Sequence, residues 1–411
     1  MNSASLDWQV IATVVIFVAT YAGVALGRIP GFRIDRAGIA LLGASAMIAA
    51  GALSLEDAFN AIDLDTIALL LGMMIIVGQL RVSGFFELAS RFAIQRAHGP
   101  VVLLAAIVIV TGFFSAFLVN DAICLVMTPL VIEVTRVLRR NPIPYLLAVA
   151  MASNAGSVAT FTGNPQNMII GIASHIPYAD FAARLAPVAA AALALTLCLV
   201  GLFHPTEFST PFATVPKQAR PRQHIRQIRK GLLVSACVVI AFFLGVPIAK
   251  AAIIGGSILL VSRAVNPRKI YAGVDGRLLL MFAGLFIVVA AAEKMLLSQE
   301  VMTAAQQLHL ENAWILSAAT ALLSNLVSNV PAVLALKPFI ANLADSHRAW
   351  LIVAMSSTLA GNLTLIGSVA NLIVAERAKA ADVKIAFFDH LKVGLPLTAL
   401  SLAFGTWWLA R

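Results

Sequence analysis

Charged residues are scarce in this sequence. Only 12% of the 411 residues are Asp, Glu, Lys or Arg, whereas 60% are hydrophobic and the mean hydropathy is +0.93. A soluble domain carries about 25% charged and about 45–50% apolar residues, so a soluble fold is excluded. Apolar stretches of roughly 20 residues, enough for a helix to cross a bilayer, recur from Trp8 to Trp408. Because lipid cannot pair with backbone groups, we expect an all-α polytopic membrane protein.

Cysteine is rare as well, and several catalytic motifs are missing. Cys124, Cys198 and Cys237 all lie in apolar stretches, without the spacing of a disulfide framework or a metal site. The sequence has no phosphate-binding Gly-Lys-Ser/Thr loop, no His-Glu-x-x-His motif and no nucleophile elbow. We therefore expect neither an enzyme nor an ATP-driven pump, and no cofactor apart from sodium ions or protons as coupling ions.

The basic residues, which give a net charge of +10, lie mostly in short loops between apolar stretches. This placement indicates membrane topology rather than nucleic-acid binding, because Lys and Arg accumulate on the cytoplasmic side. Arg28, Arg33 and Arg36 follow the first stretch, which places the N-terminus outside a cell (inner) membrane. A basic, proline-rich segment at 204–230 is expected to be a cytoplasmic linker that also contacts anionic lipid headgroups.

The stretch 101–137 is apolar except near Asn120 and Asp121, and basic residues flank both of its ends. Both ends are therefore expected on the cytoplasmic side. A re-entrant helical hairpin over about 99–137, with its polar tip at membrane depth, satisfies this condition. Two ordinary membrane spans would satisfy the same charges.

The second half of the chain repeats the first. The segment 117–129 aligns with 326–338, keeping Asn and Pro in place, and 153–167 aligns with a segment four residues shorter at 361–371. We therefore expect two repeats, 1–203 and 231–411, each with about five transmembrane helices and one hairpin. The second hairpin is expected at about 313–343, and helices broken at mid-membrane at about 142–173 and 350–376. Because each repeat has an odd number of spans, the second repeat starts on the opposite side of the membrane from the first, so the two repeats are inverted.

Polar residues within apolar spans are functional candidates because they are costly to bury in lipid. At a broken helix, the N-terminus favours an anion, whereas freed carbonyls and side-chain oxygens can bind sodium. For Gly156 and Gly361, close helix packing is the alternative explanation. The predicted substrate- or ion-binding residues are Asn120, Asp121, Ser153, Asn154, Gly156, Ser157, Thr160, Gly163, Asn164, Asn167, Ser328, Asn329, Asn362, Thr364, Gly367, Ser368 and Asn371. Sodium is expected at Asn120, Asp121, Asn329, Gly163 and Gly367.

Asp121 stands out because its own segment contains no basic neighbour. A carboxylate at bilayer depth needs a cation, a proton or a partner, so Asp121 is the expected coupling residue. Lys337, in the returning helix of the second hairpin, could offset this charge, attract an anion or extend to the outer surface.

The segment 120–129 resembles the first hairpin tip of arsenite permeases, and 163–167 (Gly-Asn-Pro-Gln-Asn) resembles the broken-helix motif that follows it. Nearly the whole chain resembles the ion transporter superfamily, which also includes sodium/proton antiporters and divalent anion/sodium symporters. The resemblance implies a homodimer in which each protomer has a scaffold part and a mobile part. The symporters carry Ser-Asn-Thr at both tips. Here only Asn120 and Asn329 are kept, which favours a small inorganic substrate over a dicarboxylate.

These observations predict a secondary active transporter that moves a small anion or oxyanion by alternating access, coupled to a sodium or proton gradient. A sodium/proton antiporter with Asp121 as the exchanging group is the alternative within transport. A channel is a further alternative, which saturable and gradient-driven flux would reject. A membrane-embedded enzyme would require clustered titratable residues.

Overall fold

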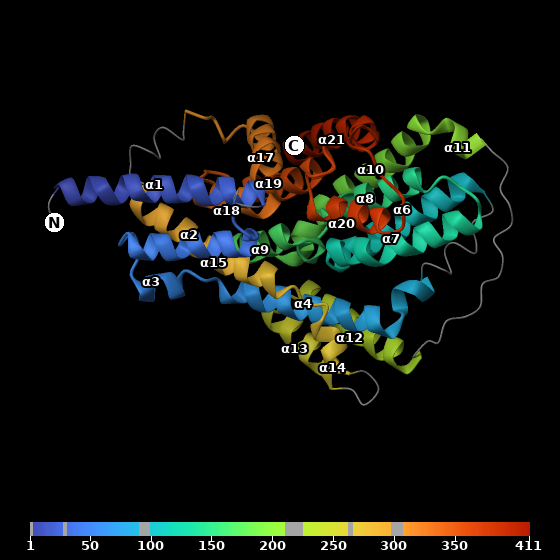
Figure 1. Cartoon of the computed structure of the whole chain (residues 1–411), viewed down its shortest axis with the longest axis horizontal. Helices are drawn as coiled ribbons and strands as arrows, with labels where there is room; N and C mark the ends of the chain where they lie inside the picture. The colour runs from blue at the N-terminus through green and yellow to red at the C-terminus, as the bar shows by residue number, and fades with distance from the viewer. Residues whose placement is uncertain (1–2, 28–30, 90–98, 210–224, 262–265, 297–306) are drawn as a thin grey trace.

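The computed structural model describes residues 3–27, 31–89, 99–209, 225–261, 266–296 and 307–411. Within these ranges the regular elements are all helices (Figure 1). Five are long and apolar enough to cross a membrane: Trp8–Leu26, Leu64–Ser83, Pro100–Phe117, Tyr178–Phe203 and Gly276–Met295. The prediction of an all-helical, polytopic protein is confirmed. The inverted relation of the repeats stays a prediction, and residues 210–224 of the expected linker lie outside the described ranges.

One group of helices, called here the flanking helices, lies along one side of the molecule (Figure 1). Within this group α2 packs against α1 and α15, whereas α4 packs against α12 and α13. The flanking helices are α1 (Ser3–Leu26), α2 (Arg36–Ala49), α4 (Leu64–Ser83), α12 (Ile225–Phe243), α13 (Ile248–Leu260) and α15 (Gly276–Leu296). The short helices α3 (Leu55–Asn60) and α14 (Pro267–Tyr271) precede α4 and α15.

Two glycines let the flanking helices approach closely. A Cβ atom on Gly72 of α4 would overlap the backbone of Ala252 in α13, and one on Gly284 of α15 would overlap the backbone of Ala40 in α2. Small residues permit such contacts between membrane helices, where dispersion and not hydrophobic burial favours association. The α4–α13 and α2–α15 contacts therefore have the same construction.

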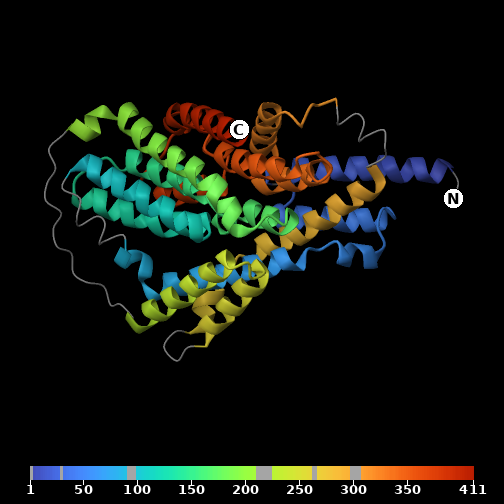
Figure 2. The same ribbon diagram turned by 180° about the vertical axis from the view of Figure 1, so that it is seen from behind.

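The remaining long helices form what we call the hairpin bundle, which is continuous in both views (Figures 1 and 2). Pro100, Pro142 and Pro165 each occupy a first helical position, where the missing N–H costs no hydrogen bond. The bundle contains α6 (Pro100–Phe117), α7 (Asn120–Val137), α8 (Pro142–Ser157), α9 (Pro165–Ala173), α10 (Tyr178–Phe203), α17 (Ala313–Val327), α18 (Asn329–Ile340), α19 (Ser346–Ala360), α20 (Val369–Lys379) and α21 (Phe387–Leu409).

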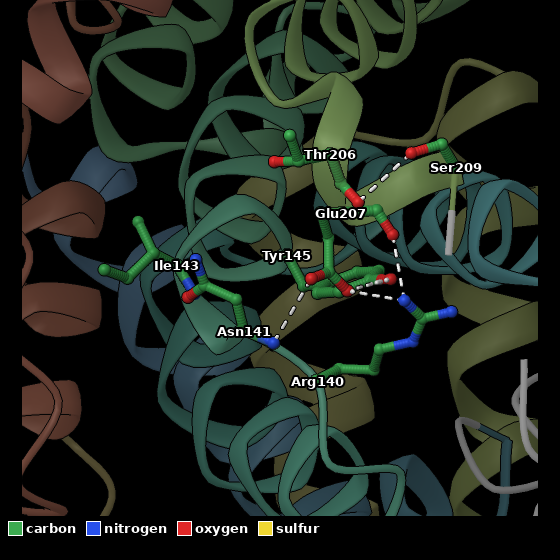
Figure 3. A network of polar contacts seen from close by, with 7 residues as sticks. All are labelled: Arg140, Asn141, Ile143, Tyr145, Thr206, Glu207 and Ser209. Atoms are coloured by element: carbon green, nitrogen blue, oxygen red, sulfur yellow. Dashed lines mark hydrogen bonds and ion pairs between the residues drawn. The ribbon is translucent and has the colours of Figure 1, made fainter. Parts of the chain in front are cut away.

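A short helix, α11 (Pro205–Ser209), ties the end of α10 to the connection between α7 and α8 (Figure 3). The Arg140 guanidinium donates a hydrogen bond to the Glu207 carbonyl oxygen at 2.9 Å and lies 3.5 Å from its carboxylate. Tyr145 donates its hydroxyl to the same carboxylate at 3.2 Å, and the backbone N–H of Asn141 does so at 3.4 Å. The first residues of the central linker segment are thus attached to the hairpin bundle.

Candidate functional site

Each hairpin turns within one or two residues, and each second helix begins with asparagine. Leu118 and Val119 connect α6 to α7, which starts at Asn120, and Ser328 alone connects α17 to α18, which starts at Asn329. Neither start is capped by a side chain of the preceding residue, which leaves backbone N–H groups available at the α18 tip, whereas at α7 the Asn120 side-chain oxygen accepts the Asp121 N–H at 3.0 Å. Ser328 has φ +77° and ψ 160°, a region used almost only by glycine, and strain of this kind is typical of functional sites.

The first broken helix contains Asn167, which stabilises its own unwound segment. α8 ends at Ser157, and α9 begins at Pro165 after a short 3-10 turn, Phe161–Gly163. The Asn167 amide donates to the carbonyl oxygens of Ser157 and Thr160, both at 3.1 Å. Asn164 caps α9 by accepting the Asn167 backbone N–H at 2.9 Å. These bonds supply donors to carbonyl groups at the helix break, where the Ser157 carbonyl also accepts from the Asn164 amide at 3.3 Å.

The second broken helix uses the same arrangement. The Asn371 amide donates to the carbonyl oxygens of Gly361 at 2.8 Å and Thr364 at 3.0 Å, and Ser368 caps α20. Donor and acceptors are separated by ten and seven residues in both halves. These bonds pair Ser157 with Gly361 and Asn167 with Asn371, so the two segments have equal length between these residues. The alignment expected from the sequence, in which the second segment is four residues shorter, is therefore wrong before Asn167. The structural counterpart of Asn154 is Thr358 and not Asn362.

Buried side chains form hydrogen bonds between the two broken helices. The Asn154 amide nitrogen lies 2.9 Å from Asn362 Oδ1, 3.0 Å from Ser368 Oγ and 3.2 Å from Asn371 Oδ1. In the opposite direction, the Thr358 hydroxyl lies 3.2 Å from the Asn164 amide nitrogen. Asn120 joins this cluster from the first hairpin tip by donating to Asn154 Oδ1 at 3.1 Å. Residues of both halves thus form one polar cluster.

A cavity of about 350 Å³ brings the two hairpin tips together. It lies between the hairpin bundle and the flanking helices, and the N-terminal ends of α2, α7, α9, α15, α18 and α20 all contribute to its wall. Its polar lining residues are Asp35, Arg36, Asn120, Asp121, Gln166, Asp275, Arg277, Ser328, Asn329 and Ser368. We call it the tip cavity.

Asp121 also lines a second cavity of about 650 Å³, called here the side cavity, between α4 and α7. Arg81, Asp275 and Arg277 contribute to its wall. None of the ion pairs formed within the described part of the chain involves Asp121. Asp121 occupies the first turn of α7, where the helix dipole stabilises a negative charge.

Some predicted residues line the tip cavity, and others support it. Asn120, Asp121, Ser328, Asn329 and Ser368 line it. Ser153 bonds the thiol of Cys124, and the Thr160 hydroxyl bonds the carbonyl of Ala116, so neither faces the cavity. The residues that hold the helix breaks are the buried Asn154, Ser157, Asn164, Asn167, Asn362 and Asn371 and the half-buried Thr364.

The glycines among the predicted residues are packing positions. A Cβ atom on Gly156 would overlap the Gly112 carbonyl, one on Gly163 would overlap that of Ser157, and one on Gly367 would lie 3.0 Å from the Gly361 carbonyl oxygen. Gly361 is likewise packed against Ser368. Of the five residues expected at a sodium ion, the structure brings Asn120, Asp121 and Asn329 to one cavity, and it places Gly163 and Gly367 outside its lining.

Sequence reasoning missed six residues of this region, of which Asp35 and Asp275 line the tip cavity where they cap α2 and α15. Arg36 was interpreted only as a topology signal, yet it lines the tip cavity, as do Arg277 and Gln166. Thr358 bonds the first broken helix from the second. Gln166 lies within the motif at 163–167 and could have been selected from it. No local pattern distinguishes Arg36 from Arg33, because the difference depends on which helix face meets the bundle. Lys337 does not line either cavity.

Comparison with known proteins identifies relatives over the whole chain. Residues 14–360 match the model of the CitMHS family, described as citrate transporter. The chain is 31% identical to an uncharacterized transporter of Mycobacterium tuberculosis, with 97% of each protein covered. It is 28% identical to the silicon efflux transporter LSI3 of Oryza sativa subsp. japonica, covering 92% of this chain and 93% of that protein.

Two solved structures have the same fold. The YdaH transporter of Alcanivorax borkumensis superposes with a TM-score of 0.64 at 15% identity, covering 98% of this chain and 97% of that one. MtrF of Neisseria gonorrhoeae, from a class of antimetabolite efflux pumps, gives a TM-score of 0.62 at 11% identity, with 99% and 96% covered. At these identities the likeness concerns the fold alone.

Proposed function

Because the chain belongs to the CitMHS citrate transporter family of membrane transporters, we propose that it is a secondary active transporter of a small anion or oxyanion. Transport uses alternating access and is coupled to a sodium or proton gradient. The protein acts as a homodimer in the cell (inner) membrane, with its N-terminus outside and the central linker cytoplasmic. Both hairpins enter the membrane without crossing it.

The observation that carries this proposal is the meeting of two uncapped helix N-termini, those of α7 and α18, at one cavity. Each N-terminus carries about half an elementary positive charge, which favours an anion, and α18 also offers free N–H donors, whereas the Asp121 N–H of α7 is bonded to Asn120. Carboxylates of Asp35 and Asp275 cap α2 and α15 and neutralise those two ends. Neutral residues cap α9 and α20, so of the four bundle helices that start at the cavity only α7 has a carboxylate in its first turn, that of Asp121, and the ends of α9, α18 and α20 remain positive toward a substrate.

Arg36 strengthens the preference for an anion. It is half-buried, it lines the tip cavity, and no ion pair within the described residues involves its guanidinium. Arg277 is a weaker contributor because Asp275 lies 3.9 Å from it and the Arg277 side chain is 80% exposed. A cavity of about 350 Å³ is at the lower end of ligand pockets, which suits one small anion.

Asp121 is the proposed coupling residue. Both cavities reach it, so an ion or proton could arrive from either while the anion occupies the tip cavity. Binding of sodium or a proton at Asp121 would remove a negative charge next to the substrate. Occupancy of the two sites would then be linked, as symport requires. Asn120 and Asn329 would bind the substrate or ion from the two tips.

A sodium/proton antiporter is the second candidate. It is favoured by the same carboxylate, because Asp121 has access to two cavities and no ion pair within the described part of the chain. In that case Asp121 would bind sodium and a proton alternately, and the tip cavity would contain no anion.

Uptake into proteoliposomes tests the two candidates. Arsenite, sulfate, phosphate, silicic acid, succinate and citrate would be offered under imposed sodium or proton gradients to wild type and to Asp121→Asn. Silicic acid is included because the rice relative is a silicon efflux transporter. Saturable, gradient-driven anion flux that is lost in the variant is the expected result. Sodium/proton exchange without flux of any of these solutes would contradict anion transport and favour the antiporter.

A further inference from the structure

His390 is a buried histidine beside the second broken helix. Its side chain lies in α21 with 0% exposure, and Nε2 is 3.0 Å from the carbonyl oxygen of Asn362. A carbonyl can only accept, so Nε2 must carry the hydrogen. Nδ1 has no hydrogen-bond partner among the described residues. The geometry therefore assigns the neutral Nε2–H tautomer to His390.

The surface of α21 around His390 fits the unwound segment closely. Gly394 lies one helical turn after His390, and a Cβ atom there would overlap the Asn362 carbonyl oxygen and lie 2.9 Å from that of Leu363. Backbone of the segment thus rests directly on α21, at a place where only glycine leaves room. His390 donates a hydrogen bond to the Asn362 carbonyl group, and the absence of a side chain at Gly394 lets the same carbonyl group lie close to α21.

Asn362 continues this contact to the tip cavity. Its Oδ1 accepts from the Asn154 amide at 2.9 Å, and its own amide donates to the Met151 carbonyl at 3.3 Å. Asn154 Oδ1 in turn accepts from Asn120, which lines the tip cavity. A continuous series of hydrogen bonds therefore runs from His390 through Asn362 and Asn154 to the first hairpin tip.

We propose that His390 is a positioning residue for the tip cavity. By donating from Nε2 it fixes the Asn362 backbone, and Asn362 then orients the Asn154 amide against Asn120. The structural part of this inference stands by itself, whereas its effect on anion binding rests on the proposed function. Glutamine can replace the donor because its amide nitrogen reaches a position similar to that of Nε2, whereas leucine has a similar size and no donor.

Hydrogen–deuterium exchange of residues 359–371 tests the structural part without any ligand. In His390→Leu these amides are expected to exchange roughly 3- to 10-fold faster, the range corresponding to one net hydrogen bond. His390→Gln should restore slow exchange. Gly394→Ala should accelerate exchange while keeping the imidazole, and Gly201→Ala, where a Cβ meets nothing within 4 Å, should not. Equal exchange in wild type and His390→Leu, or equal acceleration by leucine and glutamine, would overturn the inference.

Transport then tests the effect on binding. For whichever of arsenite, sulfate, phosphate or citrate the wild type carries, His390→Leu should raise KM by roughly 3- to 10-fold, and His390→Gln should restore it. An unchanged KM would overturn the positioning role. Faster exchange in His390→Leu, together with no anion flux in the wild type, would refute the proposed function and support the structural role alone.

Discussion

At the scale of single residues, two asparagines perform the same task in the two halves of the chain. Asn167 and Asn371 each donate both amide hydrogens to backbone carbonyls of their own broken helix. Both side chains are fully buried. The unwound segments can therefore lie inside the protein because side-chain donors replace the missing helical N–H groups.

Asn167→Ala and Asn371→Ala are each expected to destabilise the protein by about 1–3 kcal/mol, because each variant loses two side-chain hydrogen bonds to backbone carbonyls. The free energy of unfolding from detergent micelles by SDS would measure this. Asn342→Ala is the matched control, since its amide bonds the Pro338 carbonyl on the exposed surface. Destabilisation no greater than that of the control would show that the carbonyls find other partners.

Arg36→Gln is expected to raise KM for the transported anion by about 10- to 100-fold, the range for losing one hydrogen bond to a charged group. The matched control is Arg33→Gln, because Arg33 is exposed and does not line the tip cavity. Initial rates of uptake into proteoliposomes give both values. Similar changes in the two variants would indicate a general effect of surface charge.

At the scale of helices, the bundle side of the tip cavity is built from short and interrupted elements, whereas the long helices α1 and α15 reach it only with their ends. α9 has 9 residues and α20 has 11, whereas α10 has 26. The helix breaks place the N-termini of α9 and α20 inside the molecule, and the hairpins place those of α7 and α18 there as well. Long apolar helices with exposed side chains, such as α1 with Trp8, Ile11 and Val15, instead face the surroundings.

Gly72→Ala and Gly284→Ala are each expected to cost about 1–3 kcal/mol of stability, because a methyl group would force two backbones apart. Thermal unfolding in detergent should show a lower midpoint for each. Gly201→Ala on α10 should leave the midpoint unchanged or raise it, since nothing lies near its Cβ position and alanine favours helix. If both variants unfold at the same midpoint temperature as the wild type, this would argue against tight α4–α13 and α2–α15 contacts.

At the scale of the whole molecule, both cavities lie between the hairpin bundle and the flanking helices. The bundle contributes both tips, both broken helices and Asp121, whereas the flanking helices contribute Arg36, Arg81 and Arg277. Sliding of one group against the other would therefore carry the polar cluster as a unit. The scaffold and mobile parts that the family resemblance implies stay a prediction.

Cysteine accessibility would detect this movement. Ala122 of α7 and Val77 of α4 both line the side cavity. In a Cys198→Ser, Cys237→Ser background, Ala122→Cys should react with a water-soluble maleimide, and an imposed gradient that favours the opposite state should slow the reaction roughly tenfold. Ala380→Cys, at the exposed end of α20, should react independently of the gradient. A gradient-independent rate at position 122 would contradict movement at this cavity.

The sequence by itself determined the membrane environment, the helical class and the places where helices break, because all three depend on local composition. Sparse charge requires a lipid solvent, and Gly, Asn and Pro at 163–165 cannot continue a helix. Only the tertiary structure decided which distant groups meet. Arg36 enters the tip cavity, Thr358 pairs with Asn164, and His390 donates to Asn362, because helix packing directs these side chains toward partners that no local pattern specifies.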